Sequence, residues 1–230
     1  AGESEIAACR LEECLFLDTE TTGLVVAGTL VFLCGTLRLE SPGTFLLRQH
    51  FLESPGSERA FLERLRPEIE AAGLLVTFSG KSFDRHRLAD RFSITGFEST
   101  VRRARHLDLL HAARRVWKGF LPDTRLRTLE AQILGLKREA DLPGALCPEL
   151  YFSWLRGHWV DLEPVFFHNR LDVFSLVALL GRLGLDPSAG PVPLPLLISH
   201  AMRLERVDPL SAAPLFALAE IGRASCRETM

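Results

Sequence analysis

The segment Leu15-Phe16-Leu17-Asp18-Thr19-Glu20-Thr21-Thr22-Gly23 begins as a short apolar run and turns polar at its fourth residue. The apolar part predicts a buried strand over residues 13 to 18. Because successive side chains of a strand alternate between its two faces, Asp18 and Glu20 are expected on the same face. Two carboxylates on one face repel each other unless a cation lies between them. The pair therefore indicates either a solvated strand end or half of a site for Mg²⁺ or Mn²⁺.

The pattern that follows predicts a mixed α/β fold. Further strands are expected over residues 30–39 and 44–50 as an antiparallel meander, and a strand buried on both faces over residues 74–78. Ser57 is the expected N-cap of a helix that Pro67 should bend or shorten. Additional helices are expected over residues 82–92, 107–118, 125–135, 148–156 and 162–183. This order predicts an antiparallel meander plus parallel strands in one sheet flanked by helices.

Composition limits the classes of protein to which the chain can belong. With 230 residues, 47% of them hydrophobic, it can bury one sizeable core, and a net charge of -2 says little about partners. The five cysteines form no CxxC pair, which favours ordinary thiols and a reducing, cytoplasmic setting. The longest apolar stretch is too short to cross a bilayer, and the first residues do not resemble a signal peptide. We therefore expect no membrane association.

Two other acids complete a possible constellation. Asp84 follows the expected strand at 74–78 and falls in the first turn of a helix, where a carboxylate either caps the helix or faces a ligand at the strand's carboxyl end. His168 and Asp172 are four residues apart and so lie on one helical face, as a surface pair or as a base beside a metal ligand. The same helix carries Phe167 and Phe174 in a stripe that we expect to pack on the sheet.

The chain beyond residue 185 is predicted to be separate from this fold. Residues 186–193 are rich in Pro and Gly and predict a linker. Residues 194–205 and 210–221 predict a short helical hairpin. Residues 220–228 resemble the translation of a common sequencing adapter, and residues 222–230 are expected to be a non-native tail. We thus expect a catalytic domain over residues 11–185 and a partial helical extension over residues 194–221.

Basic residues concentrate in the middle of the chain. Between Arg85 and Arg138, thirteen basic and five acidic side chains give a net charge of +8. Such a segment is either a set of solvated helix faces or a surface that follows phosphates. The cluster that best fits phosphate contacts is formed by Arg102, Arg103, Arg105, Arg114 and Arg115. His106 and Asp108 are expected to hold their segment in place, and the three Trp residues either to pack internally or to stack on bases.

The ordered set of motifs resembles the YprB-type ribonuclease H-like domain, within the DEDD exonucleases of the ribonuclease H-like superfamily. The resemblance spans about residues 11 to 185. It is carried by Phe16–Leu24, Gly80-Lys81-Ser82-Phe83-Asp84, His106–Leu110, Leu129-Glu130 with Leu134-Gly135, Asp141-Leu142-Pro143-Gly144 and His168-Asn169-Arg170-Leu171-Asp172. It implies a ribonuclease H-like sheet, and the helices after residue 194 look similar to the start of a tetratricopeptide-like region that would bind a protein partner.

The resemblance also implies roles for individual residues. Asp18, Glu20, Asp84 and Asp172 would hold two Mg²⁺ or Mn²⁺ ions. His168 would orient or deprotonate the attacking water; its identity matches one subgroup and its spacing to Asp172 the other, so both roles stay open. Contacts to nucleic acid would come from Thr21, Thr22, Gly23, Leu24 and Lys81, together with Arg102, Arg103, Arg114 and Arg115. Ser79 stands where relatives often have Asn.

The function expected from the sequence is a 3′–5′ exonuclease that hydrolyses phosphodiester bonds of single-stranded DNA or RNA. Two cations about 3.5–4 Å apart stabilise the attacking and leaving oxygens in such reactions. Two alternatives are a non-catalytic nucleic-acid-binding module and a scaffold acting through its C-terminal helices. A degenerate relative would usually have lost at least one of the four acids, and all four are present.

Overall fold

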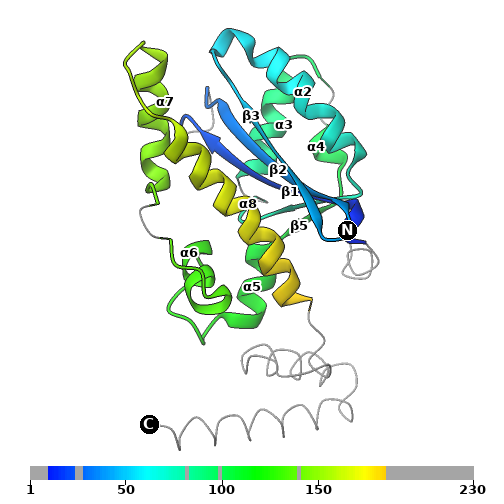
Figure 1. The fold of residues 1–230 in the computed structure, drawn as a ribbon. Coiled ribbons are helices and arrows are strands. Elements are labelled where there is room, and N and C mark those ends of the chain that lie inside the picture. The colour runs from blue at the N-terminus through cyan, green and yellow to red at the C-terminus, as the bar shows by residue number, and fades with distance from the viewer. Residues whose placement is uncertain (1–9, 24–27, 81–82, 98–99, 139–140, 185–230) are drawn as a thin grey trace, which may run out of the picture. The chain divides into compact units, whose positions relative to one another are not determined.

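The computed structural model describes residues 10–23, 28–80, 83–97, 100–138 and 141–184 (Figure 1). The chain divides into two compact units. The first unit contains Ala1–Leu109 and Lys137–Val177, and the second contains Leu110–Leu136 and Ala178–Met230. The predicted linker, helical hairpin and tail lie outside the described residues.

The first unit is built on one mixed sheet of five strands in the order β3-β2-β1-β4-β5. Strand β1 pairs antiparallel with β2 and parallel with β4, so the meander and the parallel strands share one sheet as the sequence predicts. The strands are β1 (Cys14–Thr21), β2 (Val31–Ser41), β3 (Thr44–Phe51), β4 (Leu74–Thr77) and β5 (His106–Asp108). Strand β5 was not expected: the prediction of a helix from residue 107 is wrong at its start, because three residues are too few to show strand alternation.

Four helices of the first unit were expected: α2 (Glu58–Ala71), α3 (Asp84–Ile94), α7 (Cys147–Leu155) and α8 (Glu163–Leu183), whose last turns belong to the second unit. The short helices η1 (Leu11–Glu13), η2 (Pro55–Ser57), α4 (Thr100–Arg103) and η4 (Gly144–Leu146) were not predicted. Pro67 lies inside α2 without ending it, so the expected shortening does not occur. Ser57 is the N-cap residue, but its hydroxyl donates to the carbonyl of Ser54 instead of capping the helix.

In the second unit, helix α5 (Leu109–Trp117) begins at the unit boundary and is followed by α6 (Leu126–Leu129) and the π-helical turn η3 (Glu130–Leu134). The segment predicted as one helix over residues 125–135 is therefore a short α-helix that widens into a π-helix. Gly135 ends it with a φ of 70°, a left-handed conformation that glycine adopts at little cost.

The main core lies between the sheet and the helices of the first unit. Leu15 and Leu17 of β1 alternate with Phe16 and Asp18, and the leucines pack with apolar side chains of α2 and α3. In Figure 1, α2, α3 and α4 lie on one side of the sheet, and α8 runs across the other. On the α8 side, a side chain added at Gly35 of β2 would meet Asn169 and Val173. This packing places the Asp18 face of β1 under α8.

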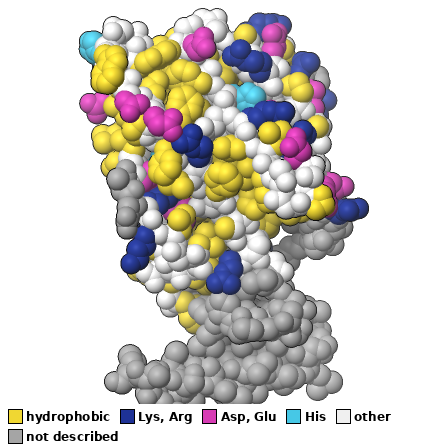
Figure 2. Space-filling model, viewed as in Figure 1, with side chains coloured by type: hydrophobic (Ala, Val, Ile, Leu, Met, Phe, Trp, Pro, Cys, Tyr) yellow, Lys and Arg dark blue, Asp and Glu magenta, His cyan; other side chains and the backbone are white. Residues whose placement is uncertain are grey.

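The orientation of α8 differs from the predicted one. Phe167 and Phe174 are 41% and 48% exposed, so the stripe that was expected to pack on the sheet faces solvent. The buried face instead carries Val165, Asn169 and Val173. Figure 2 shows apolar side chains at the surface over α7 and α8, in keeping with these exposed rings. The prediction is wrong because it placed the largest apolar side chains inside, whereas the fold buries a polar residue of this helix.

Two further expectations can be compared with the structure. Cys34 and Cys147 are buried free thiols, and Cys14 is buried as well; Cys9 and Cys226 lie outside the described residues. No helix in the described part of the chain is both long and apolar enough to cross a membrane.

Candidate metal centre

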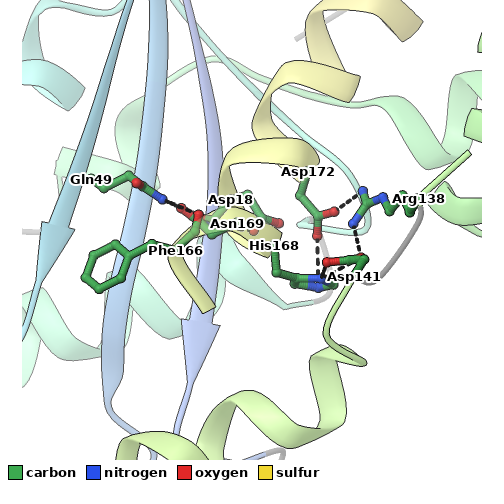
Figure 3. A network of polar contacts seen from close by, with 8 residues as sticks. All are labelled: Asp18, Gln49, Arg138, Asp141, Phe166, His168, Asn169 and Asp172. Atoms are coloured by element: carbon green, nitrogen blue, oxygen red, sulfur yellow. Dashed lines mark hydrogen bonds and ion pairs between the residues drawn. The ribbon is translucent and has the colours of Figure 1, made fainter. Parts of the chain in front are cut away.

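Strand β1 presents Asp18 and Glu20 on the face covered by α8. Asp18 stands opposite Gly35 of the neighbouring strand. Its carboxylate accepts a hydrogen bond of 2.9 Å from the side-chain amide of Asn169 (Figure 3). Glu20 is only 9% exposed and accepts a hydrogen bond from the thiol of Cys147, at the start of α7. The two acids are therefore buried functional groups with specific partners, and a solvated strand end does not describe them.

Asp84 reaches the same region from the carboxyl end of β4. It is the first residue of α3 and only 4% exposed. Its carboxylate accepts a hydrogen bond from the hydroxyl of Thr19, which lies between Asp18 and Glu20 on β1. Asp84 thus sits at the end of a central parallel strand, where open α/β sheets commonly bind ligands.

Helix α8 contributes Asp172 and His168, one turn apart. The Nε2 atom of His168 lies 3.7 Å from Oδ2 of Asp172, as their spacing predicts. His168 is 8% exposed and Asp172 is partly buried. The pair is therefore enclosed and is not a surface ion pair.

The pKa values of Asp18, Glu20 and Asp84 are raised, first by burial and then by the charges of neighbouring acids. Burial raises the pKa of Asp18 well above its ordinary value, and the charges of Asp172, Asp84 and Glu20 raise it further. Burial, followed by the charge of Asp172, raises the pKa of Glu20 to about 8. Burial also raises the pKa of Asp84 to about 6, although its hydrogen bond with Thr19 acts in the opposite direction. The surroundings of the cluster therefore do not fully stabilise the ionised form of these carboxyl groups.

The chemistry of these donors fits a divalent cation. Carboxylate oxygens are the ligands that Mg²⁺ and Mn²⁺ prefer, and a cation among them would relieve their mutual repulsion. Within the described residues, no three His, Cys, Asp or Glu side chains converge as a completed set of metal ligands. Asp172 is hydrogen-bonded to Arg138 and Asp84 to Thr19, so two of the acids have other partners. The residues that would hold cations are Asp18, Glu20, Asp84 and Asp172.

Asn169 is a site residue to which sequence reasoning gave no role. Its side chain is completely buried. Gln49 of β3 donates from Nε2 to Oδ1 of Asn169 at 3.0 Å and to the carbonyl of Phe166 at 2.8 Å (Figure 3). Because the Asn169 oxygen accepts from Gln49, its NH₂ group is directed at Asp18. This relay from β3 through α8 to β1 orients the Asp18 carboxylate.

Gly35 makes room for that relay, which leads to a prediction. A Cβ atom at position 35 would lie 2.3 Å from Oδ1 of Asn169 and 2.8 Å from Cγ2 of Val173. We expect Gly35→Ala to displace Asn169 and to lower the free energy of unfolding by about 1–3 kcal/mol, as overpacking of a core usually does. Urea denaturation measures this loss.

Gly181→Ala is a matched control, because a Cβ at that helical position meets nothing within 4 Å. Alanine is favoured over glycine inside helices by about 1 kcal/mol, so this variant should be as stable as the wild type or more stable. Equal stability of Gly35→Ala and the wild type would show that the contact with Asn169 can relax at little cost.

Arg138 and Asp141 were also missed as site residues. Arg138 was counted among the basic residues of a phosphate-binding segment, but its side chain is 3% exposed. It donates to Asp141 at 3.0 Å and also to Asp172. Asp141 in turn contacts Nδ1 of His168 at 3.0 Å. Arg138 is therefore an internal partner of acids, a role that only its tertiary position reveals.

The turn after β1 holds part of the predicted nucleic-acid contacts. The hydroxyl of Thr21 donates to the carbonyl of Gly23 at 3.0 Å, and that of Thr22 accepts from the Leu30 amide at 2.9 Å. These bonds shape the turn beside the acid cluster. Leu24 and Lys81 lie outside the described residues.

The predicted basic cluster is divided between the two units. Arg102 and Arg103 lie in α4 of the first unit, and Arg114 and Arg115 in α5 of the second. Arg102 is paired with Asp90 at 2.9 Å. On the face drawn in Figure 2, basic and acidic side chains are interspersed. A phosphate-binding role for these arginines stays a prediction.

Other residues that the sequence suggested as site residues contact neighbouring parts of the protein. His106 and Asp108 were expected to hold a helix in place, but they lie on strand β5. The backbone amide of Ser79, just after β4, donates to Asp108, and Thr77 is hydrogen-bonded to His106, so His106 and Asp108 tie β5 to the end of β4. Trp117 is fully buried in the second unit. Trp154 packs against Phe51 and Tyr151. Trp159, 95% exposed, is the only one of the three Trp rings open to a base.

The fold and the acids can now be compared with known proteins. The chain is 38% identical over 167 residues to "Uncharacterized protein YprB" of Bacillus subtilis (strain 168), a match that covers 71% of this chain and 40% of that protein. Two solved structures share the fold at a TM-score of 0.50. The product-bound structure of exonuclease I is 15% identical and the match covers 73% of this chain and 42% of that one. The apo structure of exonuclease I is 14% identical, with 89% and 44% covered.

The chain thus spans less than half the length of these relatives. The model of one family, described as the RNase_H superfamily, matches residues 15–184, which include all of the sheet except Cys14, together with all four acids. This match covers well over half of the chain and agrees with the mixed five-stranded sheet. The chain therefore belongs to the ribonuclease H superfamily.

Proposed function

We propose that the chain is a divalent-cation-dependent nuclease that hydrolyses phosphodiester bonds of single-stranded DNA or RNA from the 3′ end. The observation that carries this proposal is the group of four buried or partly buried acids from β1, α3 and α8. Membership of the ribonuclease H superfamily and the fold shared with exonuclease I support it. Mutually repelling buried carboxylates are costly to a fold, and bound cations supply a reason for their presence.

In this proposal the four acids hold two Mg²⁺ or Mn²⁺ ions. The cations would neutralise the scissile phosphate and stabilise the leaving oxygen. Asn169 keeps the Asp18 carboxylate oriented, and Thr19 does the same for Asp84. Cys147 holds Glu20 through its thiol. Neutral hydrogen-bond donors of this kind fix the directions of the carboxylates without adding positive charge that would compete with a cation.

His168 would act as the general base. It would take a proton from water, the water oxygen would form a bond to phosphorus, and the bond from phosphorus to the 3′ oxygen would break. The leaving oxygen would then take a proton from solvent. Imidazole is suited to this exchange near neutral pH. Its enclosed position beside Asp172 places it next to the acids.

The deciding experiment is degradation of fluorescent single-stranded DNA and RNA with Mg²⁺, with Mn²⁺ and with EDTA. The proposal predicts cation-dependent cleavage, and products that shorten from the 3′ end indicate an exonuclease. Binding without cleavage under every condition would favour a non-catalytic module. Cleavage that persists in EDTA would contradict a role for divalent cations.

A second measurement tests the role of His168. We expect His168→Ala to lower the rate of cleavage by about 10²–10⁴-fold, the usual contribution of a general base. His158→Ala is the matched control, since His158 is exposed in the segment between α7 and α8. A loss of less than tenfold for His168→Ala would make His168 a positioning residue and not the base.

A further inference from the structure

We infer that Asp141, held by Arg138, is a positioning residue that fixes His168 in the tautomer with its proton on Nδ1, so that the lone pair of Nε2 faces Asp172 and the acid cluster. This inference rests on the proposed function, in which His168 accepts a proton. It assigns roles to two residues that lie far from the four acids in the sequence. Figure 3 shows the arrangement: the imidazole lies between Asp141 and Asp172, and Arg138 links the two carboxylates.

The first step concerns the contact on Nδ1. Both carboxylate oxygens of Asp141 lie 3.0 Å from Nδ1 of His168. An ionised carboxylate only accepts hydrogen bonds. If Asp141 is ionised, the proton of a neutral His168 must therefore be on Nδ1. The Nε2 atom then carries the lone pair.

The second step is that the surroundings keep Asp141 ionised. Its side chain has no exposed surface. Burial opposes ionisation, but hydrogen bonds from Arg138 and His168 outweigh it and lower the pKa of Asp141. Arg138 is itself 3% exposed, so its guanidinium is committed to acids within the protein. A buried arginine is always charged and requires such acceptors.

The third step concerns the other side of the ring. Nε2 lies 3.7 Å from Oδ2 of Asp172, too far for a hydrogen bond. A Cβ added at Gly144 would lie 3.0 Å from the same Nε2 atom, so a side chain at position 144 would crowd this edge of the ring. The Nε2 edge therefore has an acid of the candidate metal centre next to it, and Gly144 presents no side chain to it. The Nδ1 edge is occupied by Asp141.

Arg138 makes the orientation specific. It donates to Oδ2 of Asp141 at 3.0 Å and, through its other terminal nitrogen, to Asp172. One guanidinium thus fixes the carboxylates that face the two nitrogens of His168. An ion pair between a planar guanidinium and a carboxylate constrains the direction of the contact as well as its length. Neither Arg138 nor Asp141 belongs to the cluster of four acids, and both act on the reaction through His168.

The variant Asp141→Asn separates this role from simple packing. Asn has nearly the same shape but only one acceptor oxygen. Because a charged donor forms the stronger hydrogen bond, that oxygen should turn to Arg138, which directs the NH₂ group at Nδ1 of His168. The histidine proton would then move to Nε2 and remove the lone pair from the side of the acids.

Long-range proton–nitrogen NMR spectra of the chain with isotope-labelled histidine report the tautomer directly, in EDTA and without substrate. His168→Gln identifies the His168 signals by their loss. We expect the Nδ1–H form in the wild type and the Nε2–H form in Asp141→Asn. Asp161→Asn is the matched control, since Asp161 is exposed and accepts only the Glu163 amide at the start of α8 in the described structure.

Kinetics supply the second readout. Asp141→Asn should lower kcat about 10- to 100-fold, the usual effect of removing a partner that orients a histidine, with KM little changed, whereas Asp161→Asn should leave both unchanged. An Nε2–H or doubly protonated ring in the wild type would overturn the inference even if Asp141→Asn failed to fold. An unaltered tautomer or kcat in a folded Asp141→Asn would do so as well. Inactivity of the wild type would count against the proposed nuclease, while the NMR spectra would still decide the tautomer.

Discussion

Asp18→Asn is expected to abolish cation-dependent cleavage and, without divalent cations, to make the protein more stable. The carboxylate of Asp18 is the member of the cluster whose pKa is raised by burial and by all three other acids. Cation stabilisation of a phosphoryl transition state is worth several kcal/mol, and 1.36 kcal/mol corresponds to a tenfold change in rate. Loss of one cation ligand should therefore lower the rate by about 10³-fold or more.

The gain in stability follows from the same crowding. Asn has nearly the shape of Asp and keeps an oxygen that can accept the hydrogen bond from Asn169. It removes one charge from a group of four acids that destabilise one another. We expect the free energy of unfolding in EDTA to rise by about 1–3 kcal/mol and Tm to rise by several degrees.

Thermal unfolding in EDTA and cleavage assays in Mg²⁺ measure the two effects on the same preparations. Asp161→Asn controls for the change of Asp to Asn at an exposed position. A variant that is inactive but less stable than the wild type in EDTA would show that repulsion among the acids does not limit stability. Full activity of Asp18→Asn would sink the nuclease proposal.

The second large effect is a loss of stability of the metal-free protein as pH rises from about 4.5 to 8. Glu20 has an ordinary pKa of 4.5, which the fold raises to about 8, and the fold raises that of Asp84 from 3.8 to about 6. Within this window the unfolded chain has released protons that the folded chain retains. The unfolded state thus binds fewer protons, and the free energy of unfolding must fall with increasing pH.

The shift of Glu20 alone, about 3.5 pKa units at about 1.4 kcal/mol each, corresponds to a loss of about 5 kcal/mol over the window, and the shift of Asp84 adds to it. Mg²⁺ should reverse it, because a cation replaces the protons that the acids otherwise retain. The pKa shift of Glu68 changes the free energy of unfolding in the opposite direction, but only at pH values below this window. Burial opposes its ionisation, while hydrogen bonds from His50 and Thr36 prevail and lower its pKa to about 2, so its contribution disappears only below about pH 4.5.

Urea denaturation at a series of pH values, with EDTA or with Mg²⁺, tests this expectation. The difference between the two curves should widen as pH increases. Glu20→Gln should flatten the dependence in EDTA because it removes the acid for which the raised pKa is about 8. Stability in EDTA that increases from pH 5 to 8 would contradict the assignment of these acids to one cluster.

Much of the fold could be predicted because its elements have strong local patterns. Strands β1, β2 and β3 and helices α7 and α8 begin and end within about three residues of their expected positions, and α2 begins directly after its expected N-cap. Strand β5 escaped prediction because its three residues carry too little pattern, and its pairing with β4 is a long-range contact. The exposed Phe167 and Phe174 show a second limit: hydrophobicity alone assigned the wrong face of α8 to the sheet.

The candidate site, like the fold, could be predicted only in part. Alternation along β1 and one helical turn in α8 were enough to pair Asp18 with Glu20 and His168 with Asp172. The partners of these residues were not predictable by such rules. Gln49 reaches Asn169 across 120 positions, and Arg138 reaches Asp172 across 34. No periodicity connects residues at such separations, so Arg138 was interpreted as a surface cation when it is an internal one.

The sequence by itself therefore determined which residue types stand at the ends of the strands and on the turns of the helix, because backbone geometry repeats every two or 3.6 residues. Only the tertiary structure decided that the Asp18–Glu20 pair is buried beneath α8, that Gly35 admits Asn169, and that Arg138 and Asp141 surround His168. These contacts depend on how separate elements pack against one another. The same packing buries the acids, and burial is the largest cause of their raised pKa values.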